Sequence, residues 1–216
     1  MCQPANVVQL GRIEMKEEYK KRFIFIAKNT IKNFKLTDEM KPVYSKLFDY
    51  FHGIPGELDL NKGNAIIGNY GVGKSTAARL FHKYLATVFP FNQNMFIISS
   101  VEDLLAELSD KNWIEGKLTY NMMENTRGGF EMKPRHVLIN EFGFKYDIKN
   151  YGSDVNELID AWLMKRYDIF QQYGKVIHIT TNFGTTELKN SFHPKLVDRF
   201  REMFNFIELK GNSLRK

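Results

Sequence analysis

The sequence predicts an α/β fold with three layers, in which helices cover both faces of a mainly parallel sheet. Three apolar runs, at residues 65–67, 137–139 and 176–179, each end in small or polar residues, as buried parallel strands do. A glycine-rich segment follows the first run directly, and a helix-forming segment follows the glycines at residues 76–80. This order of strand, glycine-rich loop and helix is a common phosphate-binding unit of α/β proteins.

The glycine-rich segment reads G-x-x-x-x-G-K-S over residues 68–75, the P-loop pattern of nucleoside triphosphatases. Lys74 is expected to reach the β and γ phosphates, and the Ser75 hydroxyl to complete the coordination of Mg²⁺. The alternative is a glycine-rich turn with an accidental Gly-Lys-Ser ending, which the flanking strand and helix disfavour. We therefore expect ATP and Mg²⁺ as cofactors, with the nucleotide held by Gly68, Asn69, Tyr70, Gly71, Val72, Gly73, Lys74, Ser75 and Thr76.

A second element is expected at His136–Glu141, an apolar run that ends in polar residues. Nucleoside triphosphatases carry such a strand, called Walker B, and we expect it beside the P-loop strand. It usually ends in a carboxylate that holds the Mg²⁺ water shell. Asn140 stands at that place, so it would hold the metal indirectly through an uncharged oxygen. Glu141 is the expected catalytic base, and the lost charge at Asn140 predicts slow hydrolysis. A buried strand that merely ends in polar residues is the alternative.

The run Lys175–Asn182 has the same form. Open parallel sheets bind ligands at the carboxyl ends of their strands, so Asn182 is expected near the γ phosphate. There its amide would orient the attacking water between itself and Glu141. A turn-forming Asn before Phe183 and Gly184 is the alternative.

With these motifs, the chain resembles the AAA+ ATPases of the DnaC and IstB group, which are bacterial replicative helicase loaders and ATPases that assist transposition. The resemblance runs from about residue 41 to the end and also includes Lys165–Tyr167, Leu196–Phe200 and Gly211–Arg215. It implies that Asn182 is the residue called sensor 1. It also implies that Arg199 is an arginine finger acting on the nucleotide of the neighbouring subunit, and it places Arg215 near a nucleotide or a subunit boundary.

Arginine suits the finger role because its guanidinium is always charged and can grip phosphate with two hydrogen bonds. Arg201 is a close competitor for this role. A surface ion pair of Arg199 with Asp198 or Glu202 is the alternative. Arg166 presents the same choice, between an ion pair on a helix surface and a second phosphate contact.

The net charge of +6 and the pI near 9.2 permit nucleic-acid binding without establishing it. Residues 1–41 hold nine basic and five acidic residues, a net charge of +4. We expect them to form a basic, partly helical arm ahead of an ATPase domain at residues 42–216. An amphipathic helix between Arg12 and Phe34 could dock onto that domain, a partner protein or a phosphate backbone; its apolar positions are Met15, Tyr19, Phe23, Ile26 and Phe34.

The length of 216 residues suits one large α/β domain with an appendage. We therefore expect no large C-terminal lid domain. The apolar runs are shorter than a membrane span and the N-terminus lacks a signal-peptide pattern, so a cytoplasmic protein is expected. Its single cysteine and scattered histidines predict no disulfide and no zinc site. Residues 112–133 are the least periodic stretch, and further elements are expected at Pro42–Phe51, Met95–Ser99, Val101–Leu108 and Val155–Phe170.

Three functions remain open. The first, which we favour, is a DNA-associated ATPase like the helicase loaders. The second is an IstB-like transposition ATPase, and the third is a nucleotide-dependent switch with little hydrolysis, suggested by Asn140. A metabolite kinase fits less well. The expected partners are single-stranded or duplex DNA, a helicase or a transposase, and further copies of this chain assembled with ATP or DNA.

Overall fold

The computed structural model describes residues 5–90, 95–109, 116–124, 129–143, 149–150 and 153–214. Its helices are α1 (Ala5–Thr30), α2 (Met40–Phe51), α3 (Lys74–Val88), α4 (Val101–Leu108), α5 (Val155–Tyr173), α6 (Thr185–Ser191) and α7 (Pro194–Met203). Its strands are β1 (Gly63–Ile67), β2 (Phe96–Ser100), β3 (Tyr120–Glu124), β4 (Phe130–Pro134), β5 (His136–Asn140), β6 (Lys149–Asn150), β7 (Ser153–Asp154), β8 (Ile177–Thr181) and β9 (Phe204–Glu208).

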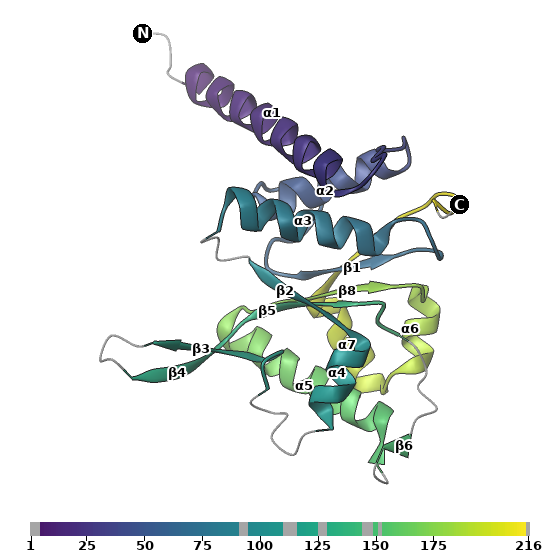
Figure 1. Ribbon diagram of the computed structural model, residues 1–216. Coiled ribbons are helices and arrows are strands. Elements are labelled where there is room, and N and C mark those ends of the chain that lie inside the picture. The colour runs from purple at the N-terminus through teal and green to yellow at the C-terminus, as the bar shows by residue number, and fades with distance from the viewer. Residues whose placement is uncertain are drawn as a thin grey trace.

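The main sheet has five strands in the order β2-β5-β8-β1-β9, and every neighbouring pair is parallel. Helices α2 and α3 cover one face of this sheet, with α1 packed on their outer side, and α4, α5 and α7 cover the other face (Figure 1). The predicted three-layer α/β fold with a parallel sheet is therefore confirmed. The expected elements at residues 42–51, 95–99, 101–108 and 155–170 appear as α2, β2, α4 and α5.

One expectation about the sheet is wrong, and one strand was missed. Strand β5 does not lie beside the P-loop strand β1, because β8 pairs with both of them through Ile179. Strand β9 was not expected at all. Among the described strands it pairs with β1 alone, at the edge of the sheet, and two of its five residues, Phe204 and Ile207, are buried. An edge strand of this kind lacks the continuous apolar run by which the central strands are recognised.

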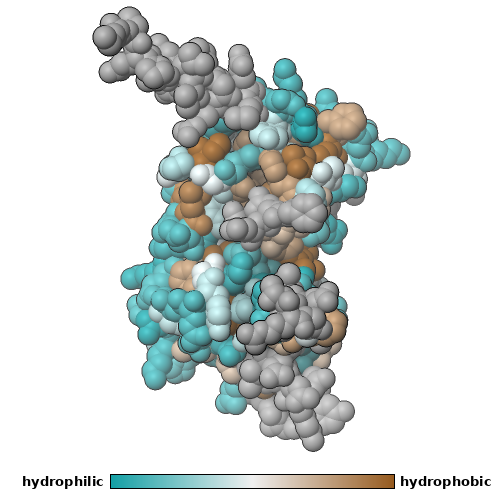
Figure 2. Space-filling model, turned by 90° about the vertical axis from the view of Figure 1, so that its left-hand side faces the viewer, coloured by the Kyte–Doolittle hydropathy of each residue, from teal (hydrophilic) through white to brown (hydrophobic). Residues whose placement is uncertain are grey.

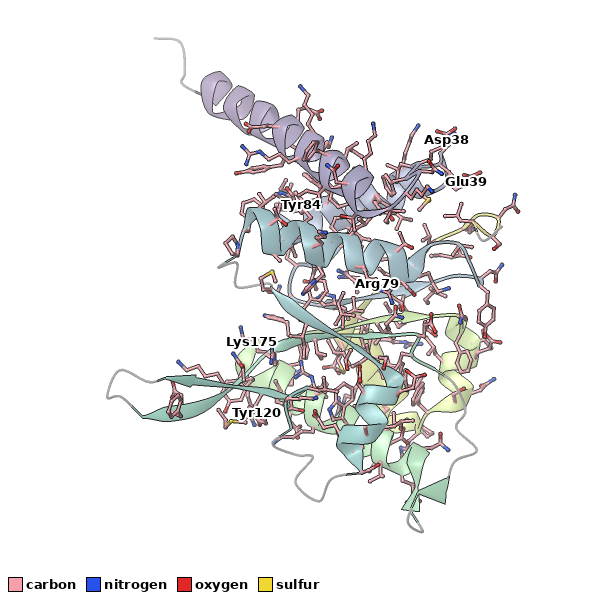
Figure 3. All side chains as sticks on the ribbon, viewed as in Figure 1. Asp38, Glu39, Arg79, Tyr84, Tyr120 and Lys175 are labelled. Carbon is pink, nitrogen blue, oxygen red and sulfur yellow. The ribbon has the colours of Figure 1, made fainter. Side chains whose placement is uncertain are left out.

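The core has two parts, one on each face of the sheet. One part joins α1, α2 and α3 through aromatic side chains, and the other joins α4, α5 and α7 around Trp162 and Phe200. Tyr84 of α3 shows the first part well, since its ring contacts Phe23 of α1 and Phe48 of α2 (Figure 3). Successive residues of β1 serve opposite faces, with Ala65 in one cluster and Ile66 in the other.

The N-terminal arm docks onto the core, which was one of its three expected uses. Phe23 and Ala27 of α1 are buried in the same cluster as α2 and α3, and Lys16 Nζ lies 2.7 Å from Asp49 of α2. Other basic side chains of α1 stay at the surface, such as Arg22, which pairs with Glu18. The side chain of Met15 lies outside the described residues. A domain boundary near residue 41 stays a prediction.

A two-stranded hairpin, β3–β4, stands away from the body of the molecule (Figure 1). It lies inside the stretch that looked least periodic in the sequence. Every described residue of Phe130–Lys133 is exposed, with Phe130 71% accessible to solvent. Because this strand has no buried face, its sequence lacks the alternation of apolar and polar residues that identifies strands.

Hydrophilic side chains cover much of the face of the molecule shown in Figure 2, and apolar side chains gather mainly in the upper half of this face. This half lies at the height of α2 and α3 in Figure 1. None of the described helices is long and apolar enough to cross a membrane.

Candidate nucleotide-binding site

The segment between β1 and α3 folds as a tight loop at the carboxyl end of the sheet. Gly71 and Gly73 have φ angles of 79° and 98°, a region that side chains with a Cβ rarely occupy. A Cβ on Gly71 would also overlap the side chain of Ser213. Glycine is therefore required at both positions for the backbone angle, and at Gly71 also because Ser213 leaves no room for a Cβ.

The amino end of α3 offers N–H donors and no acidic or capping side chain. Its N-cap is Gly73, which offers no side-chain acceptor, and its first turn holds no acidic residue. The first N–H groups of a helix need acceptors and carry the positive end of the helix dipole. Phosphate oxygens can supply these acceptors. Ser75 follows as the second residue of the helix and is partly exposed, so its hydroxyl fits the expected contact with Mg²⁺.

The Lys74 ammonium joins the loop to the end of β8. Its Nζ donates to the carbonyl oxygens of Gly68 and Asn69, each at 2.8 Å, and to Oδ1 of Asn182 at 2.6 Å. Only 6% of Lys74 is exposed. Two residues assigned to γ-phosphate chemistry from separate motifs thus meet at one point, although 108 positions separate them in the chain.

Thr180 of β8 organises the end of β5. Its hydroxyl donates to Oδ1 of Asn140 and accepts from the backbone N–H of Glu141, both at 2.9 Å. The carbonyl oxygen of an amide has two lone pairs, so Asn140 keeps one for a metal-bound water. Glu141 is exposed and has a φ of 61°, a costly backbone region for a residue with a Cβ. The sequence motif that ends at Asn182 included Thr180, but sequence reasoning gave Thr180 no role of its own.

The C-terminal segment lies against the P-loop, an arrangement that the sequence did not specify. Leu209 donates its N–H to Ile67 at 2.7 Å, and Leu214 donates its N–H to Gly71 at 3.0 Å. The side chain of Ser213 lies where a Cβ on Gly71 would be. The resemblance placed Arg215 near a nucleotide or a subunit boundary, and the structure places residues 209–214 beside the P-loop. Arg215 itself lies outside the described residues.

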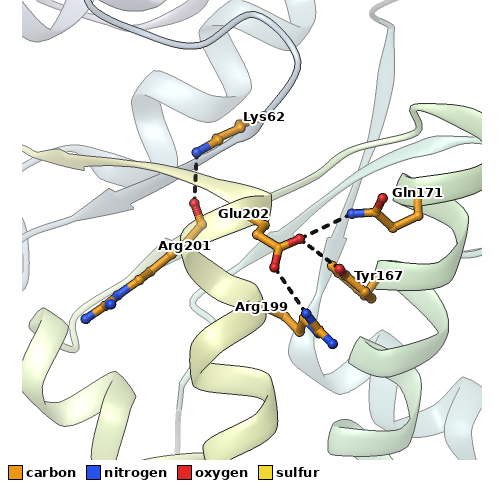
Figure 4. Close-up of polar contacts among 6 residues, drawn as sticks. All are labelled: Lys62, Tyr167, Gln171, Arg199, Arg201 and Glu202. Carbon is orange, nitrogen blue, oxygen red and sulfur yellow. Dashed lines mark hydrogen bonds and ion pairs between the residues drawn. The ribbon is translucent and has the colours of Figure 1, made fainter.

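Arg199 lies on α7, between β8 and β9, and it faces α5 (Figure 4). Its Nη1 is 3.1 Å from Oε1 of Glu202, and its guanidinium carbon is 4.7 Å from the ring centre of Tyr167. The ion pair with Glu202, given above as the alternative, is therefore present. The hydrogen bond from Tyr167 lowers the pKa of the Glu202 carboxyl, and the hydrogen bond to Glu202 raises the pKa of Arg199.

Arg166 follows neither of its two expectations. It is fully buried, and its Nη2 donates to the carbonyl oxygens of Arg135, Lys175 and Val176 at 3.0–3.4 Å. These carbonyls come just before β5 and β8, at the amino ends of the strands and away from the P-loop. Figure 3 shows Lys175 there. Burial lowers the pKa of Arg166 to about 10, which leaves it charged at neutral pH. Arg166 thus links the amino ends of β5 and β8 through hydrogen bonds.

The fold is similar to that of several solved proteins. The crystal structure of the DnaC helicase loader matches with a TM-score of 0.56 at 15% identity, over 83% of this chain and 95% of that one. Domain III of the Thermotoga maritima replication initiation protein DnaA matches with a TM-score of 0.57 at 18% identity, over 82% and 65%. The AMPPCP-bound DnaA from Aquifex aeolicus matches with a TM-score of 0.52 at 13% identity, over 85% and 50%.

No protein-family model matches the chain, and no curated protein sequence matches it. The structural likeness therefore concerns the arrangement of the backbone. Helicase loader and initiator structures share this chain's parallel sheet with helices on both faces. The chain has the α/β fold of these helicase loader and initiator structures.

Proposed function

We propose that this chain is an ATP-hydrolysing, DNA-associated ATPase that acts as the helicase loaders do. The observation that carries the proposal is the contact of Lys74 with Asn182, which brings the P-loop and the sensor residue together at the carboxyl edge of the sheet. A γ phosphate bound at this place would replace the Asn182 amide oxygen as an acceptor for the Lys74 ammonium. Asn182 would then be free to orient the attacking water.

The remaining roles follow from the positions of the side chains. Lys74 and the first turn of α3 would hold the phosphates, Ser75 would hold Mg²⁺ directly, and Asn140 would hold it through water. Glu141 would act as the base. The AMPPCP-bound DnaA structure supports nucleotide binding by this fold, and the match to a helicase loader supports DNA and a helicase as partners, which would place the protein in the cytoplasm.

Arg199 would complete the site of a neighbouring subunit. Its described contacts lie on α5 and α7, and its side chain is 38% exposed, so a second copy could reach it. Arg199 and the nucleotide site lie on different surfaces of a subunit, so Arg199 can reach a neighbour's nucleotide only through head-to-tail contact. Such contact builds rings or open helical filaments. Hydrolysis is therefore expected to increase with protein concentration and with DNA.

A nucleotide-dependent switch is the second candidate, and Asn140 favours it. An amide supplies no negative charge to the metal, and one lone pair of its oxygen is used by Thr180. Such a protein would bind ATP tightly and change its partners without frequent turnover.

Turnover measurements separate these functions. ATP hydrolysis should be measured without DNA, with single strands and with duplex, using Lys74→Ala as the blank. Stimulation by single strands supports the loader role, whereas stimulation by duplex alone supports the IstB-like role. ATP binding without hydrolysis under all three conditions supports the switch. If wild type and Lys74→Ala bind ATP equally, the proposed site is wrong.

A further inference from the structure

The arginine assigned as the finger contacts two side chains of its own subunit, Glu202 and Tyr167 (Figure 4). Glu202 is the centre of the group. Its Oε2 accepts from the Tyr167 hydroxyl at 2.8 Å and from Gln171 Nε2 at 3.3 Å, while Oε1 accepts from Arg199 at 3.1 Å. The ring of Tyr167 lies under the guanidinium. Tyr167 thus contacts both Arg199 and the carboxylate that binds it.

This arrangement uses only part of the guanidinium. The ion pair with Glu202 occupies Nη1 alone, whereas a guanidinium has five N–H donors in a planar fork. The ring of Tyr167 covers one face without using an N–H group. Among the described residues none hydrogen-bonds the edge that carries Nη2 and Nε, and this edge has the two-donor geometry that matches a phosphate.

A long arginine side chain loses conformational freedom when it is fixed in a complex, and this loss weakens the contact it makes. A side chain that is already fixed before the complex forms avoids most of that loss. Glu202 is held from α5 by two donors and can serve as a rigid anchor on α7. Tyr167 and Glu202 thus limit the positions that Arg199 can take.

We infer that Tyr167 and Glu202 are positioning residues for the arginine finger: they hold Arg199 so that its free edge meets the γ phosphate bound by the next subunit. The inference rests on the proposed trans role of Arg199. It predicts that Tyr167 and Glu202 matter only in the subunit that donates the finger, and not in the subunit that binds the nucleotide.

Mixed assemblies test this asymmetry. Lys74→Ala subunits donate an intact finger but have a defective P-loop, and Arg199→Ala subunits bind ATP but lack the finger. Each variant alone should be nearly inactive, and the mixture should hydrolyse ATP. Tyr167→Leu is then added either to the Lys74→Ala donor or to the Arg199→Ala acceptor. We expect a loss of about three- to tenfold when the donor carries it, and no change when the acceptor does.

Conservative variants separate the parts of the clamp. In the donor, Tyr167→Phe keeps the ring but loses the hydroxyl that holds Glu202, so a smaller loss than for Tyr167→Leu is expected. Glu202→Gln in the donor removes the charge of the anchor and should also reduce the rate. Arg201→Ala is the matched control: it lies on the same helix and its side chain points away from the group (Figure 4), so the rate should not change. ATP affinity of the acceptor, measured by calorimetry, should remain constant throughout.

Each other outcome has a distinct meaning. Equal losses with Tyr167→Leu in donor and acceptor would show a merely structural role and overturn the inference. A rate that rises with Tyr167→Leu or Glu202→Gln would also overturn it, because the clamp would then restrain the finger from acting. If the Lys74→Ala and Arg199→Ala mixture is inactive before any change at Tyr167, the trans role itself fails. If Arg201→Ala abolishes the rate, the finger is Arg201.

Discussion

Lys74 Nζ and Asn182 Oδ1 lie 2.6 Å apart, so the residue proposed to bind phosphate and the residue proposed to sense it are hydrogen-bonded to each other. The same ammonium also contacts two carbonyl oxygens of the loop. An anion entering the loop would compete with these acceptors for Lys74. The P-loop is thus held together, before any anion enters, by the cation that is expected to bind that anion.

Lys74→Ala should weaken ATP binding strongly. A hydrogen bond to a charged group contributes about 1.5–3 kcal/mol, so the loss should be about 10- to 100-fold in affinity. Titration calorimetry with ATP and Mg²⁺ measures it. Lys83→Ala, a change on the same helix away from the loop, is the control and should bind as wild type does. Equal affinities for wild type and Lys74→Ala would contradict the site.

Glu141→Gln should keep ATP bound and stop hydrolysis, because the amide has the same shape but cannot accept the proton of the attacking water. General-base catalysis contributes about 100- to 10,000-fold, so the rate should fall within that range. Steady-state phosphate release and calorimetry give the two quantities separately. Glu157→Gln, an exposed change at the start of α5, serves as the comparison. Unchanged turnover in Glu141→Gln would remove this residue from the mechanism.

Asn140→Asp should strengthen Mg²⁺ binding and increase the hydrolysis rate. The new carboxylate would restore the missing charge, and it could still accept the hydrogen bond that Thr180 now donates to Oδ1. Hydrolysis as a function of Mg²⁺ concentration checks both effects. An equal or slower rate with the same Mg²⁺ dependence would show that the metal is held by other groups.

Gly71→Ala should damage the loop more than Gly53→Ala damages its turn. Both glycines have positive φ angles of 79° and 64°, so each substitution carries the left-handed cost of about 1 kcal/mol. Only at Gly71 would the added Cβ meet another residue, Ser213. The difference in the free energy of unfolding between the two variants measures that clash. Adding Ser213→Gly to Gly71→Ala should recover part of the loss; no recovery would show that the tail does not press on the loop.

Stability should fall as the pH decreases from about 6.5. Burial lowers the pKa of His178 from 6.5 to about 3, so between these values the unfolded chain binds a proton that the folded chain does not. The slope contributed by this residue approaches about 1.4 kcal/mol per pH unit. Burial lowers the pKa of His52 and His82 as well. Urea unfolding at pH 7, 6 and 5 should show a smaller slope for His178→Asn; an identical slope would contradict the assignment.

The P-loop strand, its loop and its helix could be predicted because their signals are local. Glycines at fixed spacing and an apolar run are sufficient to identify them. The order of the strands could not be predicted, since it depends on which strands pair, and β8 enters between β5 and β1 without any sign in the sequence. The placement of Asn182 next to Lys74 was accessible because the carboxyl ends of parallel strands share one edge.

Other parts of the site depend on contacts between distant segments. Thr180 is one small polar residue in an apolar strand, and only the structure shows that it joins Asn140 to Glu141. Arg166 looks like a surface residue in a helix rich in charge, yet it is buried under strand ends. The contact of Glu202 with three side chains on two helices could not be inferred from spacing, because α5 and α7 are separated by β8 and α6.

The contact between Leu214 and Gly71 has a practical consequence. Any polypeptide fused after this tail would start its path beside the loop that we propose binds ATP. A purification tag or fluorescent protein at that end would therefore crowd the nucleotide or pull on the loop, and kinetic measurements made with it would report on the fusion as well as on the enzyme. A label on the amino end of α1, which Figure 1 shows on the far side of α3, leaves the loop undisturbed.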